Sequence, residues 1–174
     1  CACVVDLCAG TGAIALAVAS EDPGCRVSAV ELDDAAVVWT RRNVCGSGVE
    51  VLVGDALRVP DDGRRFDVVV TNPPYLRRID APSIPDDVTG HEPDFALFSG
   101  DDGLDLPLRL IERAAELLVP GGLFIMEHDD TQREELMAAL ATSYLWEQIE
   151  DHDDLAGRPR FVTARRRCKD GCHG

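Results

Sequence analysis

The sequence predicts an α/β fold in which helices pack against a mostly parallel β-sheet. Short apolar runs alternate with helix-length amphipathic stretches, a pattern that produces repeated strand–helix–strand units. Gly10-Thr11-Gly12 lies between the first predicted strand and the first predicted helix, and Asn72-Pro73-Pro74-Tyr75 interrupts a later apolar run. In an open α/β sheet, ligands bind at such turns, beyond the carboxyl ends of the strands.

The first five predicted elements lie within residues 3–55. CVVDLC (3–8) is an apolar run typical of a buried strand, and GAIALAVASE (12–21) is the helical stretch that follows it. RVSAVEL (26–32) predicts a second strand. DDAAVVWTRRNV (33–44) predicts a second helix, because acidic residues in the first turn stabilise the positive end of the helix dipole. VEVLVGD (49–55) predicts a third strand.

The remaining predicted elements begin at residue 66. FDVVVTN (66–72) predicts a fourth strand, which must end where two prolines remove backbone donors and fix φ. LDLPLRLIERAAELLV (104–119) predicts an amphipathic helix that ends at Pro120-Gly121-Gly122. GLFIMEH (122–128) predicts a fifth strand, and TQREELMAALAT (131–142) a further helix. Two weaker patterns predict a closing antiparallel pair of strands, at 145–152 and 158–166.

The stretch 76–103 is rich in Pro, Asp and Gly and has no clear periodicity. Because a loop of this length in a compact domain usually carries a function, it predicts a lid or a binding loop, with a disordered insertion as the alternative. No internal repeat or low-complexity linker divides the chain, so one domain with one core is expected.

The composition argues against some classes of partner. The 174 residues include 17 Lys and Arg against 32 Asp and Glu, a formal net charge of −15. Such a surface repels polyanions, so direct binding to nucleic acid or to an anionic membrane is not expected. A basic protein partner is favoured, with an acidic surface that serves only solubility as the simpler alternative. No apolar stretch approaches the ~20 residues of a membrane span, and no signal peptide is recognisable.

The seven cysteines predict a reducing compartment. Their odd number and scattered spacing do not form a disulfide framework, which favours a cytoplasmic location. Cys168 and Cys172 have the spacing of half a metal site without a second half nearby, so no metal site is predicted.

Glycines and carboxylates at successive strand ends predict a nucleoside-binding crevice. In DLCAGTGAIAL (6–16), Gly10 and Gly12 allow a tight turn and a close approach of a ligand to the free N–H groups of a helix N-terminus. Glu31 ends the second strand, where a carboxylate can accept both hydroxyls of a ribose. Asp55 follows the third strand, where it could meet the amine of an adenine ring. Together these features favour an adenosine-type ligand.

Asn72, Pro73, Pro74 and Tyr75 form a stiff corner that predicts the substrate side of the same crevice. The fourth strand adjoins the first at the switch point of the sheet, so the corner faces the glycine turn. If a methyl sulfonium donor binds there, the Asn72 side-chain oxygen and the Pro73 carbonyl can accept the two N–H groups of a planar amide or amine. The nitrogen is thereby aimed at the methyl group without a strong base. Tyr75 would stack on the planar group.

Six motifs, taken in order, carry a resemblance to a known family. They are DLCAGTGAIAL, the Glu31 strand end, GDA, TNPPY, GHEPDFALFSGDDGL and GGLFIMEH. They resemble the class I S-adenosylmethionine-dependent methyltransferases. More narrowly, HEPDFALFSGDDGL (91–104) and Glu127-His128 resemble the protein-(glutamine-N(5)) methyltransferases that modify the GGQ glutamine of peptide-chain release factors. The resemblance covers residues 3–166 and implies a Rossmann-like class I methyltransferase fold, with a mostly parallel seven-stranded sheet and helices on both faces.

The resemblance also implies roles for individual residues. It implies S-adenosylmethionine contacts from Asp6, Gly10, Thr11, Gly12, Glu31, Asp55 and Asn72. It implies catalytic roles for Asn72, Pro73 and Tyr75, and substrate contacts from Asn72, Pro73, Pro74, Tyr75 and Glu92. His128 is expected to make a structural hydrogen bond, with a role as a base as the alternative. Cys8 stands where the family often has Gly, which changes the freedom of the turn.

The organisation of the chain follows from the same resemblance. Residues 1–166 correspond to the catalytic domain and residues 167–174 to a C-terminal tail. The family's helical N-terminal domain, which helps to grip the release factor, has no counterpart in this sequence. The first strand starts at about Cys3 without an initiator Met, so we expect part of the protein to lie outside this sequence. A monomer is expected.

The sequence thus predicts an enzyme that transfers a methyl group from S-adenosylmethionine to the glutamine amide of a release factor, with S-adenosylhomocysteine as product. One alternative is a methyltransferase that acts on the exocyclic amine of adenine in DNA or RNA, using the same corner with Tyr75 stacked on the base. Another alternative is a cofactor-binding fragment without turnover.

Overall fold

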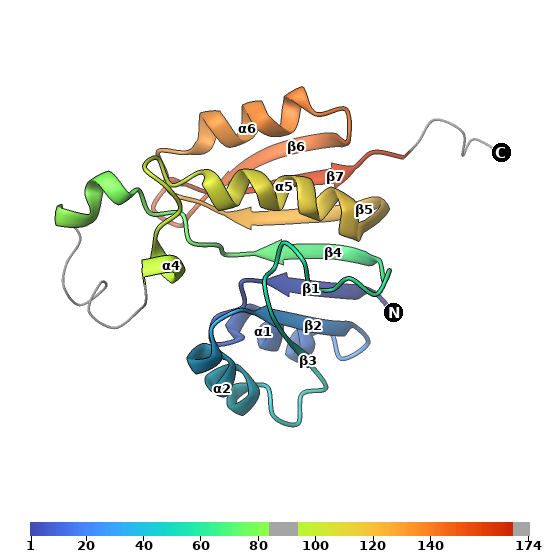
Figure 1. The fold of residues 1–174 in the computed structure, drawn as a ribbon. Helices are drawn as coiled ribbons and strands as arrows, with labels where there is room; N and C mark the ends of the chain where they lie inside the picture. The colour runs from blue at the N-terminus through green and yellow to red at the C-terminus, as the bar shows by residue number, and fades with distance from the viewer. Residues whose placement is uncertain (84–93, 169–174) are drawn as a thin grey trace.

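A seven-stranded sheet lies between two layers of helices (Figure 1). The computed structural model of the protein describes residues 1–83 and 94–168. The strands are β1 (Cys3–Leu7), β2 (Arg26–Glu31), β3 (Glu50–Val53), β4 (Phe66–Thr71), β5 (Leu118–Glu127), β6 (Trp146–Asp153) and β7 (Pro159–Arg166). The helices are α1 (Ala13–Glu21), α2 (Asp34–Asn43), α4 (Asp94–Leu97), α5 (Asp105–Leu117) and α6 (Arg133–Thr142), with the short 3-10 helix η1 (Arg78–Ser83).

The strands lie in the spatial order β3-β2-β1-β4-β5-β7-β6. β1 pairs in parallel with β2 on one side and with β4 on the other, and β3 and β5 extend the parallel part outward. β7 is antiparallel to both of its neighbours, β5 and β6. The predicted mostly parallel sheet and its closing antiparallel pair are confirmed. β1 and β4 flank the switch point, where ligands bind in sheets of this kind.

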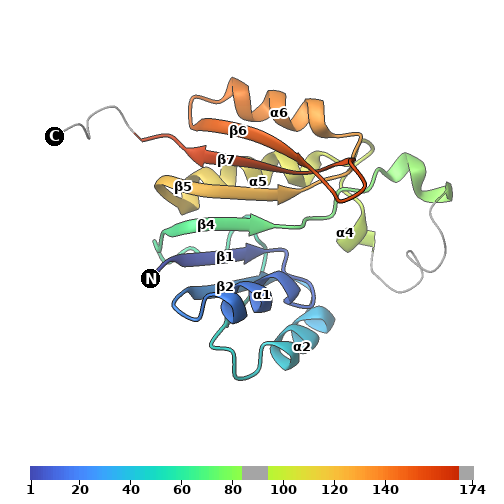
Figure 2. The ribbon, with the colours of Figure 1, turned by 180° about the vertical axis from the view of Figure 1, so that it is seen from behind.

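Helices cover both faces of the sheet, as predicted. In Figure 1, α5 lies in front of the sheet, whereas in Figure 2, seen from behind, α1 and α2 lie in front. α1 contacts α2, and α5 contacts α6, so each face carries a packed pair. α2 begins where the Asp33 side chain accepts a hydrogen bond from the Ala36 amide at 3.0 Å, which satisfies one of the free donors of the first turn.

The larger apolar core joins the sheet to α5 and α6. It includes the buried side chains of Leu110, Phe124, Leu136 and Trp146. The ring centroids of Phe124 in β5 and Trp146 in β6 are 5.4 Å apart, so the closing strands pack into the same core as the parallel ones. A smaller cluster of buried residues joins α1 to β1 and β2, and comprises Val4, Ala15, Val27 and Ala29.

The strand after α5 begins earlier than the sequence pattern predicts. β5 starts at Leu118, directly after α5, and so contains Pro120-Gly121-Gly122, which was expected to separate the helix from a strand beginning at residue 122. The pairing with β4 shifts here from Phe66–Leu118 to Val68–Leu123, so residues 119–122 form an irregular segment opposite Asp67. Gly121 has φ +81, which glycine adopts without strain. The prediction that Pro120-Gly121-Gly122 ends the helix is wrong, because α5 ends at Leu117 and these three residues lie within β5.

Within the predicted loop 76–103, the structure describes η1 and α4, and residues 84–93 lie outside the described residues. The predicted substrate residue Glu92 therefore lies outside them, as does Cys172 in the tail. No helix in residues 1–83 and 94–168 is long and apolar enough to cross a membrane. In the same two ranges, no group of three or more His, Cys, Asp or Glu side chains is arranged to hold a metal ion.

Candidate functional site

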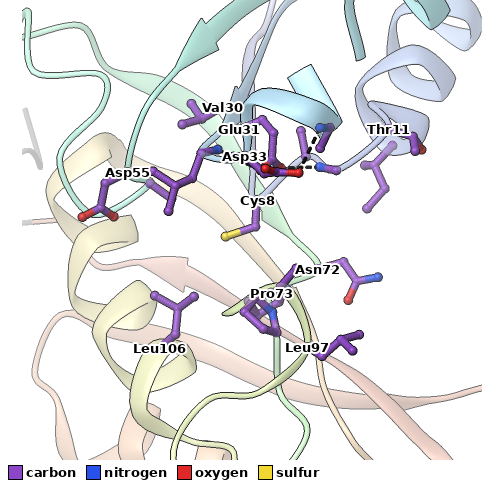
Figure 3. Close-up of a pocket in the computed structure, with 18 of the residues that line it drawn as sticks. Cys8, Thr11, Val30, Glu31, Asp33, Asp55, Asn72, Pro73, Leu97 and Leu106 are labelled. Atoms are coloured by element: carbon purple, nitrogen blue, oxygen red, sulfur yellow. Dashed lines mark hydrogen bonds between the residues drawn. The ribbon is translucent and has the colours of Figure 1, made fainter. Parts of the chain in front are cut away.

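The carboxyl ends of β1, β2, β3 and β4 open onto one cavity of about 760 Å³. In Figure 1 the arrowheads of β1, β2 and β4 point toward the edge of the sheet where α4 lies. The wall is completed by the start of α2, by α4 and by the first turn of α5. Figure 3 shows this cavity with most of the residues that line it. It is the crevice that the topology of the sheet predicts.

The turn after β1 presents its backbone to the cavity. Gly10 and Thr11 line it, and Gly10 has φ +55, a conformation that residues with a side chain rarely adopt. Two side chains of α2 fix the turn. The Thr40 hydroxyl donates to the Gly10 carbonyl at 2.6 Å, and the side-chain amide of Asn43 donates to the Thr11 carbonyl at 3.0 Å. Gly12 packs against α2 instead of lining the cavity. A Cβ at Gly12 would lie 2.9 Å from the Thr40 methyl carbon.

Glu31, at the end of β2, both lines the cavity and holds its rim. Its Oε2 accepts from the Gly10 amide at 2.7 Å, and its Oε1 accepts from the Leu32 and Asp33 amides at 2.8 Å each. Because a carboxylate offers about four acceptor positions, about one remains for a ligand hydroxyl in this arrangement. To accept from both hydroxyls of a ribose, one Glu31 oxygen would have to accept from a hydroxyl and from a backbone amide at the same acceptor position.

Asp6 lies beneath the glycine turn and is buried. Its Oδ2 accepts from the Ala15 amide in the first turn of α1 at 3.1 Å, while Oδ1 has no hydrogen-bond partner in the part of the chain that the structure describes. Burial raises the pKa of Asp6 to about 7, and the Glu31 carboxylate adds to the rise. Asp6 supports the turn and does not line the cavity.

Asp55 and Trp39 form further parts of the wall. Asp55 Oδ1 accepts from the Leu57 amide at 2.9 Å, and Arg58 lies 3.7 Å from Oδ2. Trp39 on α2 contributes an aromatic side chain that is 52% exposed. The Arg42 guanidinium lies 5.3 Å from the centroid of that ring, a favourable cation–π distance. The cavity thus combines carboxylate acceptors with a planar aromatic surface.

The corner Asn72-Pro73-Pro74-Tyr75 follows β4 and lines the cavity with all four residues. The Asn72 side chain is exposed. Tyr75 is anchored across the site, because its hydroxyl donates to Glu127 Oε1 at the end of β5 at 3.1 Å. A phenol is protonated at neutral pH and so keeps this donor, and burial raises the pKa of Tyr75 further, to about 12.

Cys8 lines the cavity beside the corner. It has φ +60, in the left-handed region that is strained for a residue with a side chain. In Figure 3 its thiol points toward the space between Pro73 and Leu106. Burial raises the pKa of the Cys8 thiol to about 12, and Glu31 adds to the rise, so the group is neutral and behaves as a small apolar side chain. Cys8 therefore places a small, uncharged side chain on the wall of the cavity near the corner.

Most of the predicted site residues come together in this one cavity. Those that line it are Gly10, Thr11, Glu31, Asp55, Asn72, Pro73, Pro74 and Tyr75. Asp6 and Gly12 do not line it: Asp6 accepts a hydrogen bond from the Ala15 amide in α1, and Gly12 packs against Thr40 in α2.

Several lining residues were missed from the sequence, among them Cys8, Trp39, Leu97 and Leu106. Leu97 belongs to HEPDFALFSGDDGL, so the family motif carried a signal for it. Trp39 and Leu106 lie on helices, and helical periodicity does not show which end of a helix borders a cavity.

His128 follows β5 and is buried outside the cavity wall. Its Nδ1 lies 2.7 Å from the Asp129 carbonyl oxygen, and its Nε2 lies 2.8 Å from Asp151 Oδ2 in β6. Arg133 in α6 donates to the other Asp151 oxygen at 2.6 Å. These contacts join β5, β6 and α6, which agrees with the structural role expected for His128.

Comparisons with known proteins identify the fold. Residues 2–84 match the methyltransferase small domain family. Among solved structures, an S-adenosylmethionine-dependent O-methyltransferase from Thermotoga maritima superposes with a TM-score of 0.70 at 15% identity, over 98% of this chain and 61% of that one. With the observed strand order, these matches show that the chain has the class I methyltransferase fold.

The sequence relatives carry more specific names. A release factor glutamine methyltransferase of Streptomyces coelicolor is 49% identical over 94% of this chain and 59% of its own length. Other bacterial relatives with the same name are 36–43% identical over 93–95% of the chain. A 4-amino-L-phenylalanine/4-methylamino-L-phenylalanine methyltransferase of Streptomyces pristinaespiralis is 38% identical over 97% of the chain and 53% of its own length.

The predicted resemblance to the release factor glutamine methyltransferases is therefore confirmed over nearly the whole of this chain. The chain spans between 55% and 59% of the length of these relatives.

Proposed function

We propose that the protein transfers a methyl group from S-adenosylmethionine to the side-chain amide nitrogen of the glutamine in the GGQ motif of a peptide-chain release factor, releasing S-adenosylhomocysteine. The observation that carries this proposal is that the Asn72–Tyr75 corner lines the same cavity as Gly10, Thr11 and Glu31. A corner suited to a planar amide thus faces a turn suited to an adenosine-type cofactor. The names of the relatives support the choice of glutamine as substrate.

The residues of the cavity fit S-adenosylmethionine, which supplies an electrophilic methyl group on a sulfonium when bound. The backbone of Gly10 and Thr11 would contact its polar end, Glu31 a ribose hydroxyl and Asp55 the adenine amine. Asp6 and Gly12 would act by holding the turn in place, through the contacts they make with α1 and α2. The volume of about 760 Å³ lies within the ordinary range of small-molecule sites.

The corner would act on the substrate by orientation. An amide nitrogen is a poor nucleophile because its lone pair is delocalised into the carbonyl. Asn72 would accept one of the two amide hydrogens on its side-chain oxygen, and the Pro73 carbonyl would accept the other. The nitrogen would then be held at the methyl group in a reactive geometry, which is the main contribution that the protein makes. Pro74 stiffens the corner, and Tyr75 provides a wall against which the planar amide packs.

The setting of the reaction forms the rest of the proposal. We assign catalysis to residues 1–166, with 167–174 as a tail, in a monomeric protein of the cytoplasm. The formal net charge of −15 favours a basic surface on the release factor and disfavours direct contact with nucleic acid.

A methyl-transfer assay with labelled S-adenosylmethionine tests the proposal. The acceptors would be a release factor, its GGQ Gln→Ala variant, an adenine-containing oligonucleotide and 4-amino-L-phenylalanine. We expect label on the unmodified release factor alone. Label on the oligonucleotide or on the amino acid would instead assign the protein to methyltransferases of exocyclic or aryl amines. Cofactor binding without label on any acceptor would identify a cofactor-binding fragment without turnover.

Replacement of Asn72 tests the role of the corner. Asn72→Ala is expected to lower the single-turnover rate constant of methyl transfer by about 100-fold, because one acceptor that orients the amide is lost, while the Kd for S-adenosylmethionine stays within about threefold. The measurements are single-turnover kinetics and calorimetric titration. Asn43→Ala is the contrasting variant, since Asn43 holds the Thr11 carbonyl and not the corner. Asn43→Ala should weaken cofactor binding more than it slows transfer. These assignments would be refuted if Asn72→Ala mainly weakened cofactor binding and Asn43→Ala mainly slowed transfer.

A further inference from the structure

Gln132 is a buried polar residue that the proposed function does not use. It stands directly before α6 and is 2% exposed. Burying a side-chain amide is unfavourable unless its donors and acceptor find partners, so its contacts indicate what the residue does.

The Gln132 side chain joins three segments that are distant in sequence. Its Nε2 donates to the Tyr75 carbonyl at 3.0 Å and to the Asp102 carbonyl at 3.3 Å. Its Oε1 accepts from the Asp129 amide at 3.1 Å. Both donors are thus used on backbone carbonyls, one of which belongs to the corner that faces the cavity.

Gly103 explains how these segments come so close together. It has φ +78, and a Cβ at this position would lie 2.1 Å from the Tyr75 carbonyl oxygen and 2.7 Å from Gln132 Nε2. Any side chain would therefore push the corner and the amide apart. Glycine at residue 103 lets the Gln132 amide reach both carbonyls.

The segment before Gly103 lies along the chain that leaves the corner. The Leu76 amide donates to the Leu97 carbonyl at 2.9 Å, and the Ser99 amide donates to the Leu76 carbonyl at 3.1 Å. The Arg78 amide donates to the Gly100 carbonyl at 3.0 Å. These bonds fix the chain just after Tyr75. Tyr75 itself makes two further contacts: its carbonyl accepts from Gln132 and its hydroxyl donates to Glu127.

We propose that Gln132 is a positioning residue for methyl transfer, which fixes the direction of the Asn72–Tyr75 corner through the Tyr75 carbonyl. The inference rests on the proposed function, because the corner must present two acceptors to one amide. A displacement of about 1 Å at such a site can slow a reaction by up to about 100-fold. Gln132 lies outside the cavity and so does not contact the cofactor or the substrate amide.

Gln132→Glu tests this role, because it keeps the shape of the side chain and replaces the donor amide by an oxygen. When the carboxylate is ionised it has no donor, and its oxygen would face two carbonyl oxygens, so the contact becomes repulsive. Gln148→Glu is the matched control: it makes the same chemical change at an exposed position in β6, away from the cavity. The chain would be compared with both variants by hydrogen exchange, by single-turnover transfer to a release factor and by titration with S-adenosylmethionine.

We expect Gln132→Glu to speed amide exchange at Leu76, Arg78 and Ser99 by at least tenfold and to lower the single-turnover rate constant of transfer by about tenfold to 100-fold. The cofactor Kd should stay within about threefold, and Gln148→Glu should behave as the unmodified chain. Unchanged exchange at these three amides would overturn the proposal. So would faster exchange throughout the sheet with equal losses of binding and transfer, which would show a general structural role.

Gln132→Met keeps the proposal testable if Gln132→Glu does not fold, because it removes the hydrogen bonds without adding a charge. Loss of the whole fold in both variants would count against a local positioning role. Hydrogen exchange requires no substrate, so it separates the two proposals. Absence of transfer by the unmodified chain would refute the proposed function, while exchange at the three amides would still decide whether Gln132 holds the corner.

Discussion

At the residue scale, Asp6 couples pH to the stability of the turn that faces the cavity. Its pKa rises from an ordinary 3.8 to about 7 on folding, chiefly because of burial. The unfolded chain therefore releases this proton at about pH 4, whereas the folded chain keeps it until about pH 7. Below pH 4 the folded and the unfolded chain both hold the proton, so Asp6 does not lower the free energy of unfolding. The free energy of unfolding falls as pH rises from about 4 to about 7, and above that range the full loss caused by the buried Asp6 charge is present.

Asp6→Asn is expected to remove this pH dependence, because the amide is neutral throughout and its oxygen can still accept from the Ala15 amide. The variant should gain stability over the unmodified chain as pH rises from 5 to 8, by an amount on the order of 1–4 kcal/mol at pH 8. Thermal unfolding at a series of pH values measures it. Asp61→Asn, at an exposed position, controls for the change in net charge. A constant difference between Asp6→Asn and the unmodified chain at all pH values would contradict the explanation.

At the scale of elements, the contact between α1 and α2 sets the shape of the glycine turn. Gly12 is the N-cap of α1, and its missing side chain leaves room for Thr40 and Val44. A Cβ at Gly12 would lie 2.9 Å from Thr40 Cγ2 and 3.1 Å from Val44 Cγ1. The helices could accommodate it only by moving apart, which would also disturb the hydrogen bond from Thr40 to Gly10.

Gly12→Ala is therefore expected to lower the free energy of unfolding by about 2–4 kcal/mol and to weaken S-adenosylmethionine binding. Gly63→Ala separates the two causes of the loss. Gly63 has φ +79, almost the same as Gly12 at +78, but a Cβ there would meet nothing within 4 Å. It should show only the backbone cost, about 1–2 kcal/mol. Equal losses in urea unfolding of the two variants would show that the packing against α2 is unimportant.

At the scale of the whole molecule, the closing strands β6 and β7 stabilise the sheet that carries the site. Trp146 in β6 is 2% exposed and packs against Phe124 in β5, so one side chain joins the antiparallel end to the parallel strands. The contacts of Asp151 in β6 with His128 and Arg133 add polar links to the same region. The parallel strands that carry the site are therefore stabilised in part by packing at the antiparallel end of the sheet.

Trp146→Ala is expected to lower the free energy of unfolding by about 3–5 kcal/mol, because it leaves a large cavity in the main core. Urea unfolding followed by circular dichroism measures this loss. Tyr144→Ala, two residues earlier and 91% exposed, should change stability by less than about 0.5 kcal/mol. A loss below about 1 kcal/mol in Trp146→Ala would show that the closing strands contribute little.

The local pattern of the sequence determined the fold and much of the site. Apolar runs and helical periodicity place every strand and every long helix within a few residues of the observed bounds, since burial on a sheet or helix face dictates these patterns. Parallel topology then brings the carboxyl ends of β1, β2, β3 and β4 together, so residues from 10 to 75 meet in one cavity. The sequence also determined the relationship to release factor glutamine methyltransferases, through the order of its motifs.

Only the tertiary structure decided which polar groups are free and which are already used. It leaves Asp6 and Gly12 out of the cavity wall, occupies most of the Glu31 carboxylate with backbone amides, and makes Pro120-Gly121-Gly122 an irregular part of β5. It also joins Gln132, Gly103 and Tyr75, whose sequence positions carry no common pattern. The physical reason is that periodicity records which face of an element is buried, whereas hydrogen-bond partners and close approaches depend on segments that meet only when the chain folds.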